Sequence, residues 1–189
     1  MKFNPSNLII ITGPSGVGKT SAALKLLKKH KNIKRLVTYT TRPRRPGERN
    51  GRDYNFVSAE KFKKMLDDGE LFEHAEVYGN YYGNRLADLK NICEKNKFCL
   101  TVLDIQGAEK IKKEFSKSKG IFLTADFKEL ARRLIKRGKM KKDDFALRQK
   151  IAKKEMANAR RFDYTVENKH EKLKETVEEI EKILKKISA

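Results

Sequence analysis

Residues 13–20 read GPSGVGKT and combine glycine, lysine and threonine at a spacing that suits phosphate chemistry. They match the pattern G-x-x-x-x-G-K-[ST], in which glycines let consecutive backbone N–H groups turn toward an anion. A helix that starts at the end of this loop adds the partial positive charge of its N-terminus. We therefore predict that the loop binds the phosphates of ATP, with Lys19 at the β- and γ-phosphates. A plain strand-to-helix turn with an exposed lysine is the alternative.

The same loop contains a candidate metal ligand. The Thr20 hydroxyl directly follows the lysine, where it is placed to bind Mg²⁺ together with water. We expect Mg²⁺ as the cofactor, with ATP as co-substrate. The residues expected to contact ATP in this loop are Gly13, Pro14, Ser15, Gly16, Val17, Gly18, Lys19, Thr20 and Ser21.

A second chemical signal is residues 40–54, TTRPRRPGERNGRDY, which contain five arginines, two prolines and two glycines. Arginine has a planar fork of donors that binds phosphate oxygens in pairs. Two functions fit this pattern: an arm that follows a nucleic-acid backbone, or a clamp for one small phosphorylated ligand. Proline and glycine fix one loop shape, which favours the clamp. The arginines are Arg42, Arg44, Arg45, Arg49 and Arg52.

Composition limits the possible partners. The chain has 189 residues, 38% of them hydrophobic and 37% charged, which is typical of a globular protein with an ionised surface. Its net charge of +20 would suit nucleic acid, but the 32 lysines are spread along the chain while the 13 arginines are concentrated. No apolar run approaches the roughly 20 residues of a membrane span, and the N-terminus lacks signal-peptide features. We expect a cytoplasmic protein with no specific nucleic-acid partner and no membrane association.

Histidine and cysteine give no sign of a metal site. Cys93 and Cys99 lack a CxxC or Cys/His pattern, and the three histidines are scattered. We expect both cysteines to be reduced and to serve core packing.

Alternating apolar strands and amphipathic helices position these residues. Such alternation is typical of an α/β fold with a doubly wound parallel sheet. Short apolar runs predict strands at residues 8–12, 36–39, 98–103, 121–124 and 164–166. Helical periodicity predicts helices at about residues 19–30, 86–95, 106–115, 127–137, 144–160 and 170–187.

Two segments interrupt this alternation. Residues 40–85 combine the arginine loop, a strand at 55–57, a helix that begins at Ser58 and an extended stretch at 71–78, which predicts a small α+β insertion. The inward face of that helix is expected to carry Phe62, Met65 and Leu66. The second interruption, residues 138–143, reads GKMKKD and has the composition of a mobile lid.

Five stretches of the chain together carry a family resemblance: TTRPRRPGERNGRDYNF, GELFEHAEVYGNYYG, LDIQGA, ARRLIKRG and DYTVEN. They resemble guanylate kinase, a nucleoside monophosphate kinase of the P-loop type. The resemblance implies phosphorylation of GMP by ATP. It also implies a single domain over residues 1–189, with a core of 1–39, 86–137 and 160–189, a GMP-binding insertion at 40–85 and a lid at about 138–159.

The resemblance also implies a GMP site within the insertion and beside it. The GMP phosphate would be held by Arg42, Arg45, Tyr54 and Tyr82. Thr38 and Asn84 would lie near the guanine, and Asn84 stands where the family has serine or threonine, with an amide that can donate to guanine O6.

Glu73 is the residue expected to recognise the base. A carboxylate can accept from both guanine N1–H and N2–H₂, whereas adenine would leave it without partners. Two alternatives remain open: Glu73 is one more polar residue on an alternating strand, or Glu76 is the recognising carboxylate.

Catalytic roles follow from the same resemblance. Asp104 would lie beside the Mg²⁺ and the reacting GMP, directly or through water, although Val102 stands where the family has a second acid. Arg137 and Arg148 flank the lid and would close over the transferring phosphoryl group. Arg133 would lie against the adenine of ATP, and Asn168 would hydrogen-bond it. The expected catalytic set is Lys19, Arg42, Asp104, Arg137 and Arg148.

The expected partners are therefore ATP and GMP, with dGMP as a further acceptor, in a monomer or homodimer. Three rival functions remain: a non-catalytic interaction module on the same fold, a basic nucleic-acid-binding protein, and a kinase for another phosphorylated acceptor.

Overall fold

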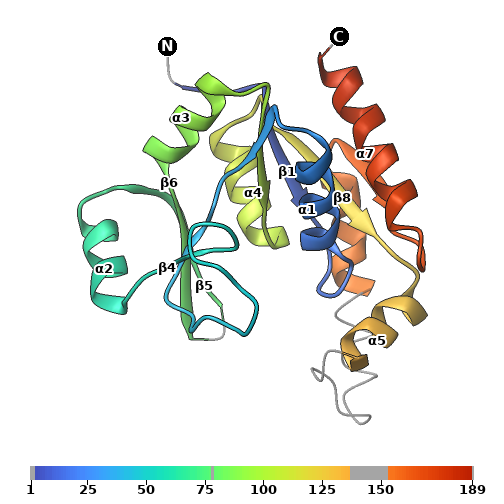
Figure 1. The fold of residues 1–189 in the computed structure, drawn as a ribbon, viewed down its shortest axis with the longest axis horizontal. Helices are drawn as coiled ribbons and strands as arrows, with labels where there is room; N and C mark the ends of the chain where they lie inside the picture. The colour runs from blue at the N-terminus through green and yellow to red at the C-terminus, as the bar shows by residue number, and fades with distance from the viewer. Residues whose placement is uncertain (1–2, 78, 137–152, 189) are drawn as a thin grey trace. The chain divides into compact units, whose positions relative to one another are not determined.

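The computed structural model describes residues 3–77, 79–136 and 153–188 (Figure 1). It divides into two compact units. The first unit is Met1–Lys31 with Val102–Ala189, and the second unit is Asn32–Thr101.

The first unit is built on three parallel strands in the order β1-β8-β9 (Figure 1). β1 (Leu8–Thr12) is buried along its whole length, as expected of a β-branched strand covered on both faces. Ile11 pairs with Ile121 of β8 (Lys119–Thr124), and Leu123 pairs with Val166 of β9 (Tyr164–Glu167). The predicted α/β class with a parallel sheet is confirmed.

Helices of the first unit pack on these strands. α1 and α4 contact β1, and α7 contacts both α1 and β9. α7 is amphipathic and buries Val177, Ile180 and Leu184, and each such burial stabilises the fold by roughly 1.5–3 kcal/mol. The helices are α1 (Lys19–Lys29), α4 (Ile105–Glu114), α5 (Phe127–Lys136) and α7 (Leu173–Ser188), with a 3₁₀ helix η2 (Ala157–Arg161).

The second unit contains a parallel pair, β2 (Ile33–Arg35) with β7 (Phe98–Val102), and a separate four-stranded sheet in the order β4-β3-β6-β5. β5 and β6 form an antiparallel hairpin. The strands of the four-stranded sheet are β3 (Tyr39–Thr40), β4 (Asn55–Phe56), β5 (Leu71–Val77) and β6 (Asn80–Arg85), and the helices of the unit are α2 (Ala59–Asp67) and α3 (Leu86–Lys95).

α2 begins where the sequence predicts. The Ser58 hydroxyl caps the helix by accepting from the Lys61 N–H at 3.2 Å. Phe62 and Met65 are buried as expected, but Leu66 is 39% exposed, so its predicted inward position is wrong. In this short helix, only Phe62 and Met65, three positions apart, are buried.

Three predicted elements differ in the structure. The single strand at 36–39 is wrong, because the chain passes between two sheets there: Leu36 donates to the Leu100 carbonyl oxygen, and Thr38 accepts from the Asn55 N–H. α7 starts at Leu173 rather than residue 170, because Glu171 has a φ of 54° that no α-helix accommodates. Residues 157–161 form a 3₁₀ helix, whereas the earlier part of the predicted helix at 144–160 lies largely outside the described residues.

Within the described ranges, no helix is both long enough and apolar enough to cross a bilayer.

Candidate active site

The phosphate loop lies between β1 and α1 in the first unit. Gly13, Gly16 and Gly18 have φ values of 138°, 85° and 99°. Gly18 is the N-cap of α1 in the left-handed region, and no side chain caps the first turn. The cap residue therefore supplies no side-chain acceptor to the N–H groups of this helix start, as in helix N-termini that bind anions.

Two of these glycines are also required for space. A methyl group at Gly13 would overlap the carbonyl oxygen of Leu123, and one at Gly18 would overlap the side-chain nitrogen of Asn168. The ammonium of Lys19 donates to the carbonyl oxygens of Gly13 at 2.6 Å and Pro14 at 3.1 Å, so it folds back over the loop. The predicted contact of Lys19 with the β- and γ-phosphates stays a prediction.

Two side chains from distant segments hold the phosphate loop at the carbonyl oxygen of Val17. Asn168 Nδ2 donates to this oxygen at 2.6 Å, and Arg133 Nη1 donates to it at 2.9 Å. The Thr176 hydroxyl of α7 donates to Asn168 Oδ1 at 2.9 Å, which fixes the orientation of the amide. The expected contacts of Arg133 and Asn168 with adenine stay predictions; both side chains support the loop backbone.

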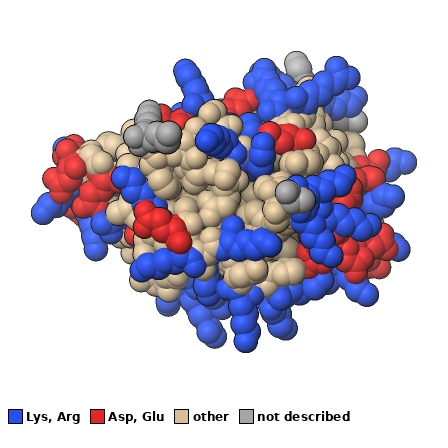
Figure 2. All heavy atoms as spheres, turned by 90° about the horizontal axis from the view of Figure 1, so that it is seen from above, with Lys and Arg blue, Asp and Glu red and all other residues tan. Residues whose placement is uncertain are grey.

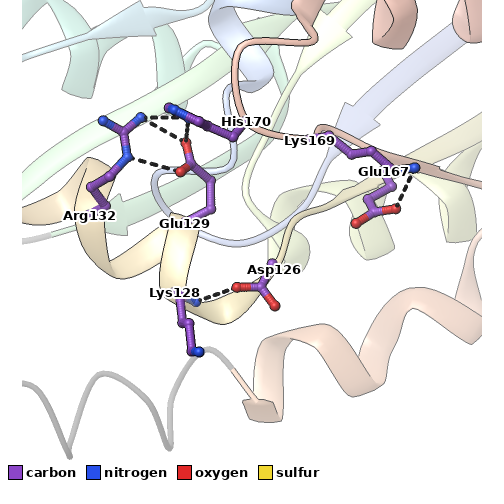
Figure 3. Close-up of a pocket in the computed structure, with 7 residues that line it drawn as sticks. All are labelled: Asp126, Lys128, Glu129, Arg132, Glu167, Lys169 and His170. Carbon is purple, nitrogen blue, oxygen red and sulfur yellow. Dashed lines mark hydrogen bonds and ion pairs between the residues drawn. The ribbon is translucent and has the colours of Figure 1, made fainter.

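Glu129 of α5 accepts hydrogen bonds from both Arg132 and Arg133, and Figure 3 shows its contact with Arg132. Its carboxylate accepts from Arg132 Nε at 2.9 Å and Arg133 Nε at 2.6 Å, and His170 Nδ1 lies 3.1 Å away. The hydrogen bond from Arg132, with those from Arg133 and His170, lowers the pKa of Glu129 to about 2. Sequence reasoning missed Glu129, although its spacing of three and four residues from two arginines was a signal.

A pocket of about 330 Å³ lies beside this cluster (Figure 3). It is lined by Asp126, Lys128, Glu129, Arg132, Glu167, Lys169 and His170.

Asp104 directly follows the strand end that reaches β1. The Leu103 N–H donates to the Ile11 carbonyl oxygen at 3.1 Å, which places Asp104 near the beginning of the phosphate loop. Asp104 is exposed and caps α4, because its Oδ1 accepts from the Gly107 N–H at 2.7 Å. The cap uses one carboxylate oxygen of Asp104. Val102, two positions earlier, has no side-chain oxygen that could serve as a second ligand for a metal.

Glu155 is a further acidic residue near the loop, and sequence reasoning did not identify it. Burial raises the pKa of the Glu155 carboxyl and the charge of Asp104 adds to this shift, while Lys19 and the Ser15 N–H counteract it. The charges of Lys19, Asp104 and Glu155 are therefore close enough to interact.

The oxygen donors here fit a hydrated Mg²⁺. Thr20 is exposed in the first turn of α1, and Asp104 offers an exposed carboxylate at the start of α4. The described ranges hold no group of three or more His, Cys, Asp or Glu that could enclose a metal. Mg²⁺ does not need one, because it keeps several waters and binds substrate phosphates.

The second unit contains the buried carboxylate predicted to recognise guanine. Glu73 is 7% exposed, and Asn84, its cross-strand neighbour on β6, is fully buried. Asn84 Nδ2 donates to Glu73 Oε2 at 3.0 Å, whereas Asn84 Oδ1 has no hydrogen-bond partner among the described residues. Thr38 is also buried, and Glu76 is exposed. Burial therefore favours Glu73 over Glu76 as a recognising residue.

The arginine loop brings together part of the predicted phosphate clamp. Arg42 Nη2 donates to both carboxylate oxygens of Glu48, at 2.7 and 3.0 Å, and its guanidinium lies 5.3 Å from the Tyr54 ring centroid. The rings of Tyr54 and Tyr82 are 6.0 Å apart. The side chain of Arg45 is exposed, but its N–H donates to Glu48 at 2.8 Å.

Electrostatics in this loop favour an anion. Burial acts to raise the pKa of Glu48, but hydrogen bonds from Arg42 and Arg45 outweigh it and lower the pKa. Burial raises the pKa of Tyr54, so the phenol stays protonated and can donate. Arg137 and Arg148, the two predicted lid arginines, lie outside the described residues.

Comparison with known proteins places these features in one family. A family model described as guanylate kinase matches residues 5–187. The guanylate kinase of Thiobacillus denitrificans is 43% identical over 166 residues, which are 87% of this chain and 79% of that protein. The guanylate kinase of Prochlorococcus marinus is 40% identical over 183 residues, which are 96% of this chain and 98% of that protein.

A solved structure agrees with the sequence comparison. The crystal structure of guanylate kinase from Anaplasma phagocytophilum has a TM-score of 0.75 and 33% identity, and it covers 97% of this chain and 86% of that chain. The phosphate loop, the buried carboxylate and the match over nearly the whole length lead to one conclusion. This chain belongs to the guanylate kinase family.

Proposed function

We propose that this protein transfers the γ-phosphoryl group of ATP to GMP and yields ADP and GDP. The phosphate loop carries this proposal, because its left-handed glycines, its uncapped helix start and its lysine form a cradle for a triphosphate. The guanylate kinase relatives, which match nearly the whole chain, support GMP as the acceptor.

The reaction is an in-line displacement. An oxygen of the GMP phosphate forms a bond to the γ-phosphorus, and the bond between this phosphorus and the β,γ-bridging oxygen breaks. The GMP phosphate is already anionic, so no general base is required. Phosphoryl transfer depends mainly on alignment and on charge around the transferring group.

Each proposed role follows from the chemistry of the side chain. Lys19 would neutralise the β- and γ-phosphates, and Arg42 with Arg45 would hold the GMP phosphate through paired donors. We extend the proposal to Arg137 and Arg148, which would neutralise the transferring group. Thr20, with Asp104 nearby, would hold Mg²⁺, which supplies further positive charge at the phosphates.

Glu73 would give the base specificity. A buried carboxylate next to an amide presents acceptors to the N1–H and N2–H₂ donors of guanine. Adenine has an acceptor at N1 and no amino group at C2, and the mismatch of these groups with the buried carboxylate typically costs several kcal/mol. We propose dGMP as a further acceptor, because nothing in this recognition involves the 2′-hydroxyl.

A substrate panel tests the proposal. Purified protein with ATP and Mg²⁺ is assayed for ADP formation with GMP, AMP, UMP and dTMP. We expect efficient turnover with GMP alone among the four. Equal activity with AMP would exclude guanine recognition, and nucleotide binding without turnover of any acceptor would favour the non-catalytic module.

A further inference from the structure

We propose that Arg35, at the end of β2, is a further residue of the GMP phosphate site: its guanidinium, which pairs with no carboxylate of the described residues, lies against Tyr54 and attracts the phosphate dianion electrostatically. The inference rests on the proposed function, because it takes Tyr54 as a donor to the GMP phosphate. All the residues involved belong to the second unit.

Arg35 is a partly buried cation for which the described part of the chain shows no hydrogen bond or ion pair of the side chain. Its guanidinium carbon lies 6.0 Å from the ring centroid of Tyr54. Its Nε is buried and has no hydrogen-bond partner among the described residues. Burial lowers the pKa of Arg35, and electrostatic interactions with Tyr54 and Asp53 offset this only in part. The cation is thus desolvated without being neutralised.

The nearby carboxylates are engaged elsewhere. Asp53 accepts from Arg52 Nε at 2.9 Å and from the Arg49 N–H at 2.8 Å. Asp88 and Arg35 line the same pocket of about 280 Å³, but Asp88 accepts from the Tyr39 hydroxyl at 3.2 Å. Neither carboxylate forms an ion pair with Arg35.

Glu48 is also engaged. It pairs with Arg42 at 2.7 Å. Two guanidinium groups, of Arg35 and Arg42, therefore lie near one aromatic ring, at 6.0 and 5.3 Å from its centroid, and only that of Arg42 has a carboxylate. This arrangement leaves an excess of positive charge beside the Tyr54 ring.

An unpaired, desolvated cation destabilises a fold unless something compensates it. A phosphate monoester carries about −1.5 to −2 charges at neutral pH and would supply the compensation when it binds. Tyr54 would donate to the phosphate directly, and Arg35 would act through the low-dielectric ring. Arg35 is then a positioning and electrostatic residue rather than a catalytic one.

The test compares binding of GMP and guanosine, which differ only by the phosphate. Both are titrated calorimetrically into the full-length protein without ATP, using the wild type, Arg35→Met and Arg35→Lys. Methionine keeps an unbranched stem against Tyr54 but removes the charge. We expect Arg35→Met to weaken GMP binding roughly tenfold and to leave guanosine binding unchanged, with partial recovery in Arg35→Lys.

The matched control is Lys34→Met, which removes the same charge from the adjacent, exposed residue of β2. It should change GMP binding less than twofold at physiological salt. Thermal denaturation should show Arg35→Met to be at least as stable as the wild type, because an unpaired cation has been removed.

Two results would overturn the inference: equal GMP affinity in Arg35→Met and wild type, or an equal loss for GMP and guanosine, which indicates structural damage. If the proposed function itself is wrong, the result differs in the wild type: it would bind GMP without turnover, or would not bind GMP at all.

Discussion

Glu73 and Asn84 form the most informative pair of residues in the second unit. Both are buried, and the amide nitrogen of Asn84 donates to one carboxylate oxygen at 3.0 Å. This contact sets the amide orientation, so the group left over is the acceptor Oδ1. The pair therefore presents acceptors, which suits the donor edge of guanine.

Glu73→Gln should lower kcat/KM for GMP about 10- to 100-fold, because a charged acceptor is replaced by a neutral amide that presents a donor. The ratio of kcat/KM for GMP to kcat/KM for AMP should fall at the same time. Steady-state kinetics with both acceptors measure the effect.

The control is Glu76→Gln, an exposed glutamate on the same strand. This variant should have kcat/KM values for GMP and for AMP within about twofold of those of the wild type. Equal losses in the two variants would argue that net charge on β5, and not base recognition, sets the rate.

Glu129 carries a second prediction at this scale. Its pKa of about 2 arises from hydrogen bonds with Arg132, Arg133 and His170. A depressed carboxyl pKa stabilises the fold above the ordinary value near 4.3, and this contribution is lost as the pH falls toward 2. Glu129→Gln should therefore cost on the order of 2 kcal/mol at pH 7, after allowance for solvent screening.

Urea unfolding of wild type and Glu129→Gln at pH 7 and at pH 3.5 provides the measurement. The stability difference should shrink by about 1 kcal/mol at the lower pH, because the unfolded carboxylate is then protonated. A difference that is independent of pH would show that the carboxylate charge contributes nothing.

At the scale of elements, the phosphate loop depends on α7 and β9 as well as on its own glycines. Thr176 of α7 orients Asn168, and Asn168 donates to Val17 of the loop. Arg133 of α5 donates to the same carbonyl oxygen. The cradle is thus held by a side chain of α5 and by Asn168, which α7 orients.

Thr176→Val should raise KM for ATP about fivefold, because Asn168 loses the donor that orients it and the loop becomes less well ordered. KM for GMP should not change, and Thr176→Ser should restore the wild-type value. Initial-rate kinetics with each substrate varied in turn test this.

Thr101→Val is the matched control, since the Thr101 hydroxyl is buried but has no hydrogen-bond partner among the described residues. The same chemical change there should leave both KM values unaltered. An unchanged KM for ATP in Thr176→Val would refute the role of α7.

Local patterns explain which elements could be predicted. β1, the phosphate loop and α1 are specified by adjacent residues, so their order and bounds follow from the sequence. The contacts that hold the loop join distant residues: Arg133 and Val17 are 116 positions apart, and Asn168 and Val17 are 151 apart. No periodicity reports such pairs, which is why the support that Arg133 and Asn168 give to the loop backbone was not predicted.

At residues 36–39 the sequence predicts a single strand that the structure does not have. Leu36 and Val37 have the composition of a strand interior, yet the chain there leaves β2 and enters β3. A crossing between sheets is set by tertiary partners, Leu100 and Asn55, that a local window does not contain.

At the scale of the whole molecule, the net charge of +20 is the feature that the proposed reaction does not require. Figure 2 shows lysine and arginine scattered over the visible face, with aspartate and glutamate between them. A nucleic-acid-binding surface usually gathers basic residues into a patch or stripe. On the face that Figure 2 shows, basic and acidic side chains are interspersed instead.

The central claim is that one chain binds a nucleoside triphosphate and a guanine monophosphate and couples them chemically. Phosphorus NMR of the protein with ATP, Mg²⁺ and GMP tests it most directly. The account predicts that the ATP signals convert to those of ADP while GMP is consumed and GDP appears, with no such conversion when AMP replaces GMP. Release of inorganic phosphate without GDP, or no change in any signal, would contradict it.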